Sequence, residues 1–250
     1  MALYNYSADV TSIVVYGIGD FHIGSPECNM GLVEQTIQRV LDTENTFAIL
    51  LGDLIDNALV NSKSDVYTAT MQPGKQIKKV AEIISPLIQN RRVLAVLDGN
   101  HEARTARSCG ISPSSVLCDI LGVSKLYTPT TALIRIKMFE TMWTIYAAHG
   151  SGGGSTIGAK ANALERRGRI AEVADVIMAG HTHVPMAFKE GIIRIDKDGN
   201  EFIANRLFLN CGSCLGYRGS YGDTAGFVPS VYGYPGVVLY SDGRDPRAVF

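Results

Sequence analysis

The feature that most constrains the fold is a short apolar run that stops abruptly at a glycine and a group of polar residues. The clearest run, Val93–Leu97, is followed by Asp98-Gly99-Asn100-His101-Glu102. Such runs are typical of buried strands in α/β proteins, where polar side chains gather at the carboxyl edge of a sheet. Four further apolar runs end in the same way, at Asp20-Phe21-His22, Gly52-Asp53-Leu54-Ile55-Asp56, His149-Gly150 and Gly180-His181-Thr182-His183.

The histidines of the chain lie only at these run ends. There are five, and each belongs to one of the polar groups: His22, His101, His149, His181 and His183. A single histidine after a strand is more often a structural hydrogen-bonding group than a ligand. Five in matching positions instead indicate one shared site, and we expect metal binding there.

The spacing of apolar residues predicts alternating strands and helices in the first half of the chain. We expect strands near residues 11–18, 46–51 and 93–97, helices at 30–41 and 73–88, and a polar connection over 57–72. After the third strand, residues 104–114 are expected to form a basic loop and 115–121 a short helix.

The residue pattern in the second half of the chain predicts β-hairpins. We expect paired strands at 132–138 with 142–148 and at 187–195 with 202–209, a helix at 157–173, and strands at 176–179 and 236–240. A parallel first half and a hairpin-rich second half predict an α/β fold in which two mixed sheets face each other with helices outside. No linker or repeat interrupts residues 1–250, so we expect a single domain.

Composition narrows the class of protein. A net charge of -1 provides no long-range attraction to nucleic acid or to an anionic membrane. No apolar stretch approaches the roughly 20 residues that cross a bilayer, and the first residues lack a signal-peptide pattern. Five scattered cysteines are an odd number, which argues against a disulfide framework. We therefore expect a cytoplasmic protein without a membrane partner.

The residue types at the run ends favour a metal site. Residues two apart in an extended chain share a face, so Asp20 with His22, and His181 with His183, could each bind one ion. Carboxylate, imidazole and amide donors suit Mn, Fe, Zn, Co or Ni, and the lack of cysteine argues against a closed structural zinc site. If Asp53 is a bridge, seven residues form two four-ligand sets: Asp20, His22, Asp53, Asn100, His149, His181 and His183.

The charge of such a site indicates its substrate. Two divalent ions bring four positive charges, two aspartates remove two, and a shared hydroxide removes one. The surplus of roughly one positive charge favours an anion, and paired metals recur in enzymes of phosphoryl transfer.

The motifs together resemble one family. In chain order, Asp-x-His, Gly-Asp-x-x-Asp, Gly-Asn-His-Glu, His-Gly and Gly-His-Thr-His are similar to the motifs of the calcineurin-like metallophosphoesterase superfamily. They extend from Asp20 to His183, about two thirds of the chain. Asn210-Cys211-Gly212-Ser213 also resembles an Asn-x-Gly-Ser element that often follows the last histidine motif in that family.

The resemblance implies a four-layer α/β/β/α sandwich with two divalent metal ions at the carboxyl ends of its strands. Manganese is the expected metal, and Fe, Zn, Ni, Co or Mg are alternatives. The nucleophile would be a metal-bridging hydroxide, without a covalent phosphoenzyme, and His101 would donate a proton to the leaving oxygen or stabilise the transition state. One ion would be held by Asp20, His22, Asp53 and His183, and the other by Asp53, Asn100, His149 and His181.

Several neighbouring residues are candidates for supporting roles. Arg104 is the best candidate for a direct phosphate contact, because a guanidinium can bind two phosphoryl oxygens; a solvated loop arginine is the alternative. Asn100 and His101 complete the expected substrate-binding set. Asp56 is expected to support catalysis by orienting a ligand or capping the next segment; the alternative is that Asp56 is itself a metal ligand. Glu102 is either such a support or a helix-start carboxylate.

Three further patterns bear on the substrate. Asn57 stands where the protein Ser/Thr phosphatase branch normally has an arginine, which argues against a dedicated phosphoprotein phosphatase. The glycine-rich segment 151–156 is either a loop beside His149 or a phosphate cradle. The basic cluster of Arg166, Arg167 and Arg169 either touches a polynucleotide or forms a solvated helix face.

The sequence therefore predicts a metal-dependent phosphoesterase that cleaves phosphodiester or phosphomonoester bonds. The paired Gly-His-x-His resembles the phosphodiesterase and nuclease branches, so the expected partner is a phosphoester substrate such as a nucleotide or nucleic acid. The alternatives are a broad-specificity phosphomonoesterase, a protein Ser/Thr phosphatase, or a non-catalytic scaffold of the same fold, as in one retromer subunit that resembles the family.

Overall fold

Two β-sheets form the framework of the computed structural model, which describes residues 1–250 except 61, 63, 153, 197, 227 and 230. The expected connection over 57–72 and the glycine-rich segment 151–156 therefore each include residues outside the described ones. Sheet A contains β1 (Ala2–Ser7), β6 (Thr131–Met138), β7 (Thr141–Ala148), β8 (Val176–Ala179), β9 (Met186–Ile195) and β10 (Glu201–Asn210). Sheet B contains β2 (Ser12–Ile18), β3 (Thr46–Leu50), β4 (Val93–Leu97), β5 (Tyr127–Thr128), β11 (Gly236–Tyr240) and β12 (Arg247–Val249).

Both sheets are mixed, as the sequence predicted. Sheet B has the order β12-β11-β2-β3-β4-β5, in which β2, β3, β4 and β5 run parallel and β11 pairs antiparallel with both β2 and β12. Sheet A has the order β1-β6-β7-β8-β10-β9, with parallel contacts at β1–β6, β7–β8 and β8–β10. All residues of β4 are buried, because sheet B is covered on both faces.

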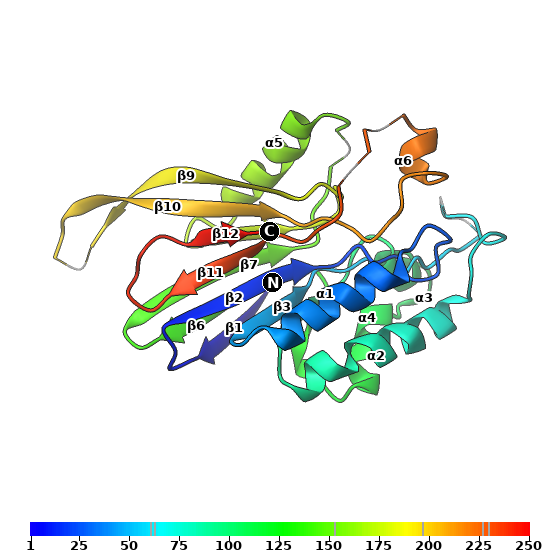
Figure 1. Ribbon diagram of the computed structural model, residues 1–250, viewed down its shortest axis with the longest axis horizontal. Helices are drawn as coiled ribbons and strands as arrows, with labels where there is room; N and C mark the ends of the chain where they lie inside the picture. The colour runs from blue at the N-terminus through cyan, green and yellow to red at the C-terminus, as the bar shows by residue number, and fades with distance from the viewer. Residues whose placement is uncertain (61, 63, 153, 197, 227, 230) are drawn as a thin grey trace.

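Helices cover the outer faces of the two sheets (Figure 1). On sheet B lie α1 (Met30–Asp42), α2 (Pro73–Gln89) and α4 (Pro113–Ile120), and α5 (Ile157–Gly168) packs on sheet A. Leu164 of α5 is buried against Ile177 and Phe208. This arrangement confirms the four-layer α/β/β/α sandwich. None of the helices in the described part of the chain combines the length and apolar character needed to cross a membrane.

Local interactions set the first residues of the helices α1 and α2. Asn29 caps α1 by accepting a hydrogen bond from the Leu32 N–H at 3.1 Å, and Pro73 occupies the first turn of α2, where its missing N–H costs nothing. The inward faces of these two helices carry buried aliphatic residues at helical spacing. The carboxyl ends of β2, β3 and β4 lie side by side at one edge of sheet B.

Two predictions of secondary structure were wrong. Residues 104–114 do not form a basic loop, because Glu102–Cys109 is the helix α3. Gly110 ends it in a left-handed conformation (φ 76°), and its N–H donates to the Ala106 carbonyl at 2.9 Å. The helix expected over 157–173 ends at Gly168 instead, because the Arg206 guanidinium binds the Gly168 and Glu172 carbonyls at 3.2 and 2.6 Å.

Candidate metal centre

Five strands direct the predicted ligands to one place. Asp20 and His22 follow β2, Asp53 follows β3, and Asn100 follows β4, all in sheet B. His149 follows β7, while His181 and His183 follow β8, in sheet A. The structure brings all seven side chains together at the carboxyl ends of these strands. Their role as metal ligands stays a prediction.

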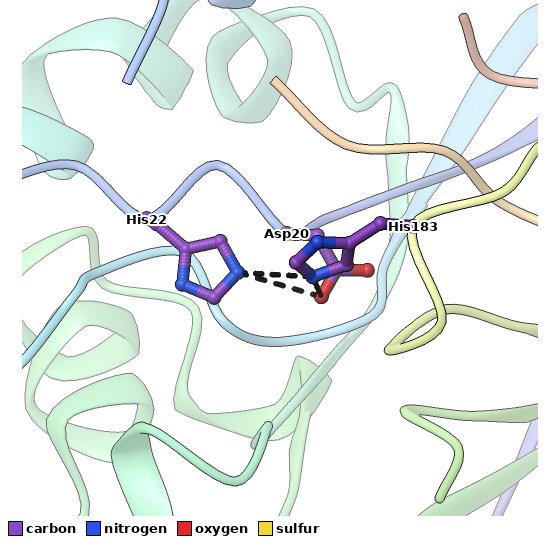
Figure 2. Close-up of side chains that lie close together, drawn as sticks. All are labelled: Asp20, His22 and His183. Carbon is purple, nitrogen blue, oxygen red and sulfur yellow. Dashed lines mark hydrogen bonds and ion pairs between the residues drawn. The ribbon is translucent and has the colours of Figure 1, made fainter. Parts of the chain in front are cut away.

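The first cluster joins the start of the motif series to its end. Figure 2 shows that the His22 and His183 rings both point at the Asp20 carboxylate. The two Nε2 atoms are 3.3 Å apart, and the Asp20 Oδ1 atom lies 3.3 Å from His183 Nε2 and 3.8 Å from His22 Nε2. Three donor atoms therefore surround one small space, and they lie close enough together to contact a single metal ion.

The second cluster contains the remaining histidine pair. The Asn100 Oδ1 atom lies 3.0 Å from His149 Nε2 and 2.7 Å from His181 Nδ1, and these two ring nitrogens are 3.3 Å apart. His149 Nδ1 contacts the Leu51 carbonyl at 2.8 Å. A proton on Nδ1 would satisfy that contact and leave Nε2 free to bind a metal.

Asp53 lies between the two clusters. Its Oδ2 atom is 3.3 Å from His149 Nε2 and 3.9 Å from His22 Nε2, so one oxygen faces a member of each cluster. Its Oδ1 atom accepts a hydrogen bond from the His101 N–H at 2.8 Å. Asp53 is therefore fixed between the two clusters, and its predicted role as a bridging ligand stays a prediction.

The backbone at these residues differs from the expected extended chain. Asp20, His22, Asp53, His181 and His183 all have positive φ, between 48° and 70°. The predicted pairing therefore fails for His181 and His183, which point into different clusters, whereas Asp20 and His22 do lie in one cluster. The left-handed turns separate His181 and His183, and such turns are known at functional sites, where surrounding structure must hold them.

Glycines make the close approach between these loops possible. A Cβ atom at Gly99 would lie 2.0 Å from Asp53 Oδ1, and one at Gly180 would lie 2.6 Å from Asp20 Oδ2. Neither position can hold a larger residue without moving a predicted ligand. The glycines of the motifs are thus as necessary to the geometry as the ligands.

Glu102 supports the Asp53 loop. The side chain is almost fully buried, and its carboxylate accepts hydrogen bonds from the N–H groups of Asp53, Leu54 and Gly99 at 2.8, 2.9 and 2.8 Å. Burial, together with nearby Asp53, raises the pKa of Glu102 to about 7, while the backbone donors favour its charged form. Between the two sequence interpretations of Glu102, the structure favours the supporting role.

Asn210 supports the last histidine loop. Its buried amide donates to the Val184 carbonyl at 2.6 Å and to Thr182 Oγ1 at 2.8 Å, on either side of His183. Residue patterns alone did not point to this role; the only signal was the resemblance of Asn210-x-Gly-Ser to a family element. In addition, Asp20 Oδ2 accepts the His181 N–H at 2.9 Å, so the loop is held from two sides.

His101 and Arg104 lie at the edge of the centre. His101 Nδ1 contacts the Asp56 carbonyl at 2.6 Å and Asp56 Oδ1 at 3.4 Å, and its Nε2 is 3.8 Å from Asp53 Oδ2. Arg104 donates to the Asp56 carbonyl at 3.0 Å and to Ser64 Oγ at 2.8 Å, and its Nη2 lies 2.9 Å from His101 Nε2. Asp56 therefore orients both side chains, and Arg104 is anchored rather than a solvated loop residue.

Asn57 has a structural task at the position where the resemblance would place an arginine in one branch of the family. Its side-chain amide donates to the His101 carbonyl at 2.6 Å and to Thr105 Oγ1 at 2.8 Å. These bonds attach the loop after β3 to the start of α3. The side-chain amide of Asn57 is consequently engaged in hydrogen bonds within the protein.

The electrostatics are those of a buried anionic site. Burial raises the pKa of Asp53, but His149 and His101 outweigh it and lower the pKa overall. Burial lowers the pKa of His149, but Asp53 and Asp20 raise it to about 10. By contrast, burial and neighbouring His101 lower the pKa of His22 to about 4. Ionised carboxylates are thus stabilised by positive charge from a neighbouring ring, a role that a bound cation can take over.

The residues present fit a pair of divalent cations. Within the described residues, Asp20 Oδ1 is one of two buried side-chain polar atoms without a hydrogen-bond partner, and it faces two imidazoles. Two nitrogen ligands about 2.0–2.1 Å from a tetrahedral ion lie about 3.3 Å apart, which matches both the His22–His183 and the His149–His181 nitrogen separations of 3.3 Å.

The comparisons with solved structures give only distant likenesses. A predicted phosphoesterase of Streptococcus pneumoniae TIGR4 is 14% identical, with 96% of this chain and 98% of the other covered and a TM-score of 0.40. Zinc-bound Vps29 of Entamoeba histolytica is 15% identical (95% and 97% covered, TM-score 0.39), and the calcineurin-like phosphoesterase YfkN of Bacillus subtilis is 12% identical (96% and 90%, 0.36). These values support no inference about activity.

The sequence itself identifies the family. No curated protein matches the chain, but the family model described as calcineurin-like phosphoesterase matches residues 13–185, which include every predicted metal ligand. The match covers more than half of the chain and ends just after the last histidine motif. On this evidence, the chain belongs to the calcineurin-like phosphoesterase family.

Proposed function

We propose that the protein is a metal-dependent phosphodiesterase that acts on nucleotides or nucleic acid. The observation that carries the proposal is the position of Asp53, whose single Oδ2 atom faces His149 of one cluster and His22 of the other. Two cations held on the two sides of this carboxylate, most suitably manganese, would supply an activated water for attack and neutralise charge on the phosphoryl oxygens.

The ligands would be shared between two ions. The first ion would be held by Asp20, His22, Asp53 and His183. The second would be held by Asp53, Asn100, His149 and His181. The donor distances reported above support this division, and so does the Asp53 loop, which Glu102 fixes through backbone hydrogen bonds.

His101 and Arg104 would complete the site from the open edge. The Asp56 carbonyl orients the His101 ring through Nδ1, which directs Nε2 toward Asp53 and the space between the clusters. In that position His101 can pass a proton to a leaving oxygen. Arg104 Nη2 lies beside the same nitrogen, so a guanidinium and an imidazole would face the phosphoryl group together.

Two features favour a diester over a monoester substrate. The Gly180-His181-Thr182-His183 motif resembles the phosphodiesterase and nuclease branches of the family. In addition, Asn57 is bound to α3 and provides no second guanidinium near Arg104. A monoester dianion carries one more negative charge than a diester and gains more from a second cation.

We also propose a cytoplasmic setting. All cysteines are free, and Cys118, Cys211 and Cys214 are buried thiols. Free thiols in this number suit a reducing compartment.

The test compares two chromogenic esters. The protein would be freed of metal, loaded in turn with Mn, Ni, Co, Mg or Zn, and assayed with bis(p-nitrophenyl) phosphate and p-nitrophenyl phosphate. We expect metal-dependent release of p-nitrophenol from the diester, and its loss in Asp53→Asn. Turnover of the monoester alone would refute the diester preference, and inertness toward a broad phosphoester panel would favour the scaffold alternative.

A further inference from the structure

The loop that carries Asp20 is contacted by residues beyond the family match. That match ends just after the last histidine motif, and the chain returns to the site at residues 211–216 and 233–234, which together form the C-terminal segment. The Tyr234 hydroxyl donates to the Gly19 carbonyl at 2.6 Å. The first predicted ligand is therefore held by a part of the chain that carries no predicted ligand of its own.

The Tyr234 hydroxyl fixes one side of the peptide group that joins Gly19 to Asp20. The other side of this planar group is the Asp20 N–H, which donates to the Gly52 carbonyl at 3.0 Å. Because both sides are bonded, the peptide group cannot rotate freely, and it helps to set the Asp20 φ of 48°. Such a left-handed φ is costly for a residue other than glycine, so surrounding contacts must hold it. The Tyr234 ring adds an edge-to-face contact with Phe21, with centroids 6.3 Å apart.

Cys214 supports the same contact. Its N–H donates to the Asp20 carbonyl at 3.1 Å, and its Sγ atom lies 3.1 Å from the Tyr234 oxygen. A carbonyl oxygen only accepts, so the single hydroxyl proton of Tyr234 goes to Gly19 and the Cys214 thiol is the donor to Tyr234. Gly19, Asp20, Cys214 and Tyr234 are all buried. Water therefore has little access to replace any of these bonds.

The C-terminal segment reaches this loop because two of its glycines lie against each other. A Cβ atom at Gly212 would lie 2.0 Å from the Gly233 carbonyl oxygen, so a larger residue does not fit there unless the backbone moves. Gly233 directly precedes Tyr234. The Cys211 N–H donates to the Ala179 carbonyl at 2.7 Å, at the end of β8. The segment therefore contacts the chain after β2 in one sheet and β8 in the other.

We propose that Tyr234 is a positioning residue for the metal centre, because its hydroxyl holds the peptide group before Asp20 and thereby the direction of the Asp20 carboxylate. Asp20 Oδ1 faces His22 and His183 (Figure 2) and has no hydrogen-bond partner among the described residues. This oxygen is therefore directed by the backbone and not by a hydrogen bond of its own. The inference rests on the proposed function, since it takes Asp20 to bind a cation.

The first experiment measures metal affinity in a variant that lacks only the hydroxyl. Tyr234→Phe keeps the ring against Phe21, and circular dichroism with urea unfolding establishes that it folds. In calorimetric titrations of the metal-free protein with Mn²⁺, we expect the affinity to fall about 10- to 100-fold, the usual effect of removing a group that orients metal ligands.

Tyr4→Phe is the matched control. It removes a hydroxyl that also donates to a backbone carbonyl, that of Leu126 at 3.0 Å, from the edge strand β1, which carries no predicted ligand. Both variants should unfold at lower urea concentration, but only Tyr234→Phe should bind Mn²⁺ more weakly. An affinity within twofold of the unmodified protein in folded Tyr234→Phe, or equal losses in the two variants, would overturn the inference.

Hydrogen exchange of the metal-free proteins tests the positioning without a metal. The Asp20 N–H belongs to the peptide group that Tyr234 holds, so Tyr234→Phe should speed its exchange about 2- to 10-fold, the effect of one net hydrogen bond. Tyr4→Phe should leave that exchange unchanged. Unchanged exchange in Tyr234→Phe refutes the inference even where the proposed function holds. If the unmodified protein binds no Mn²⁺, the proposed function fails, and faster exchange would still show that Tyr234 holds the Asp20 loop.

Cys214→Ala decides the matter if Tyr234→Phe does not fold. It removes the thiol that donates to the Tyr234 oxygen and retains the backbone N–H that Asp20 binds. We expect Mn²⁺ affinity to fall about 2- to 10-fold, the effect of one hydrogen bond. Cys118→Ala, which removes a buried thiol from α4, is the control and should leave the affinity unchanged. Equal affinities of these two variants would refute the inference.

Discussion

Asn210 offers the sharpest test of how the site is built, because it touches no predicted ligand side chain and yet holds the loop that carries two of them. Its amide Nδ2 donates to the Val184 carbonyl at 2.6 Å and to Thr182 Oγ1 at 2.8 Å, immediately after and before His183. Replacement by alanine removes both donors. The loop would then lose its fixed left-handed turn at His183, where φ is 57°.

The size of the effect follows from burial. Asn210 is 1% exposed, so water cannot freely replace its amide, and a buried carbonyl left unpaired costs about 1–3 kcal/mol of folding free energy. Groups that orient metal ligands typically change metal affinity by about 10- to 100-fold when they are removed. We therefore expect Asn210→Ala to fold with reduced stability and to bind both metals more weakly. His183 serves one cluster and His181 the other, so neither metal should be spared.

The assay is metal titration of the refolded variants, with circular dichroism and urea unfolding to establish that they are folded. Asn210→Asp has nearly the same volume but lacks the amide donors, and it should resemble the alanine variant. Asn205→Ala is the matched control: it removes an asparagine of the same strand, β10, whose amide binds Asp245 away from the site. If Asn210→Ala is folded and binds both metals with affinities within twofold of the unmodified protein, the loop does not depend on this amide and our reasoning is wrong.

Two further substitutions test the centre. Asp53→Asn should reduce the occupancy of both metals, measured by elemental analysis after dialysis, because the carboxylate oxygen that faces a histidine of each cluster loses its charge; a loss confined to one metal would contradict the bridging position. His101→Ala should keep both metals and lower kcat by about 10²- to 10⁴-fold, since the hydrogen bond that Asp53 accepts from His101 comes from the backbone N–H, which the variant retains. Loss of a metal in His101→Ala would instead assign His101 as a ligand, which its placement beside His22 and Asp53 would permit.

The sequence predicted best the strands and helices whose ends are marked by local residue patterns. Val93–Leu97 is a strand with the predicted bounds, and α2 begins at Pro73 as expected. The strand β1 was not predicted, although it alternates exposed and partly buried residues, because it pairs with β6, more than a hundred residues away. Short edge strands such as β5 depend in the same way on distant pairing rather than on local pattern.

The convergence of the candidate ligands could be predicted from the sequence, but their arrangement could be predicted less well. Polar residues after buried strands indicated which side chains meet, and the structure brings them together. Grouping them by alternation in an extended chain assigned His181 and His183 to one ion, but the left-handed residues that follow β8 send them to separate clusters. No periodicity in the sequence reports a single positive φ. The resemblance to the family implied the grouping that the structure shows.

The same loop explains why the two clusters should act as one unit. His181 and His183 belong to different clusters but to one short turn, and Asp20 of the first cluster binds the backbone of His181 in the second through Oδ2. Asp53, which like Asp20 follows a strand of sheet B, contacts a histidine of each cluster and so joins the clusters a second time. Buried and hydrogen-bonded loops cannot relax independently. We therefore expect that a shift of the side chains in one cluster also shifts those in the other, through the contacts of Asp20 and Asp53. The left-handed conformations are thus stabilised by contacts between the two sheets, and the geometry of the centre depends on the packing of sheet A against sheet B.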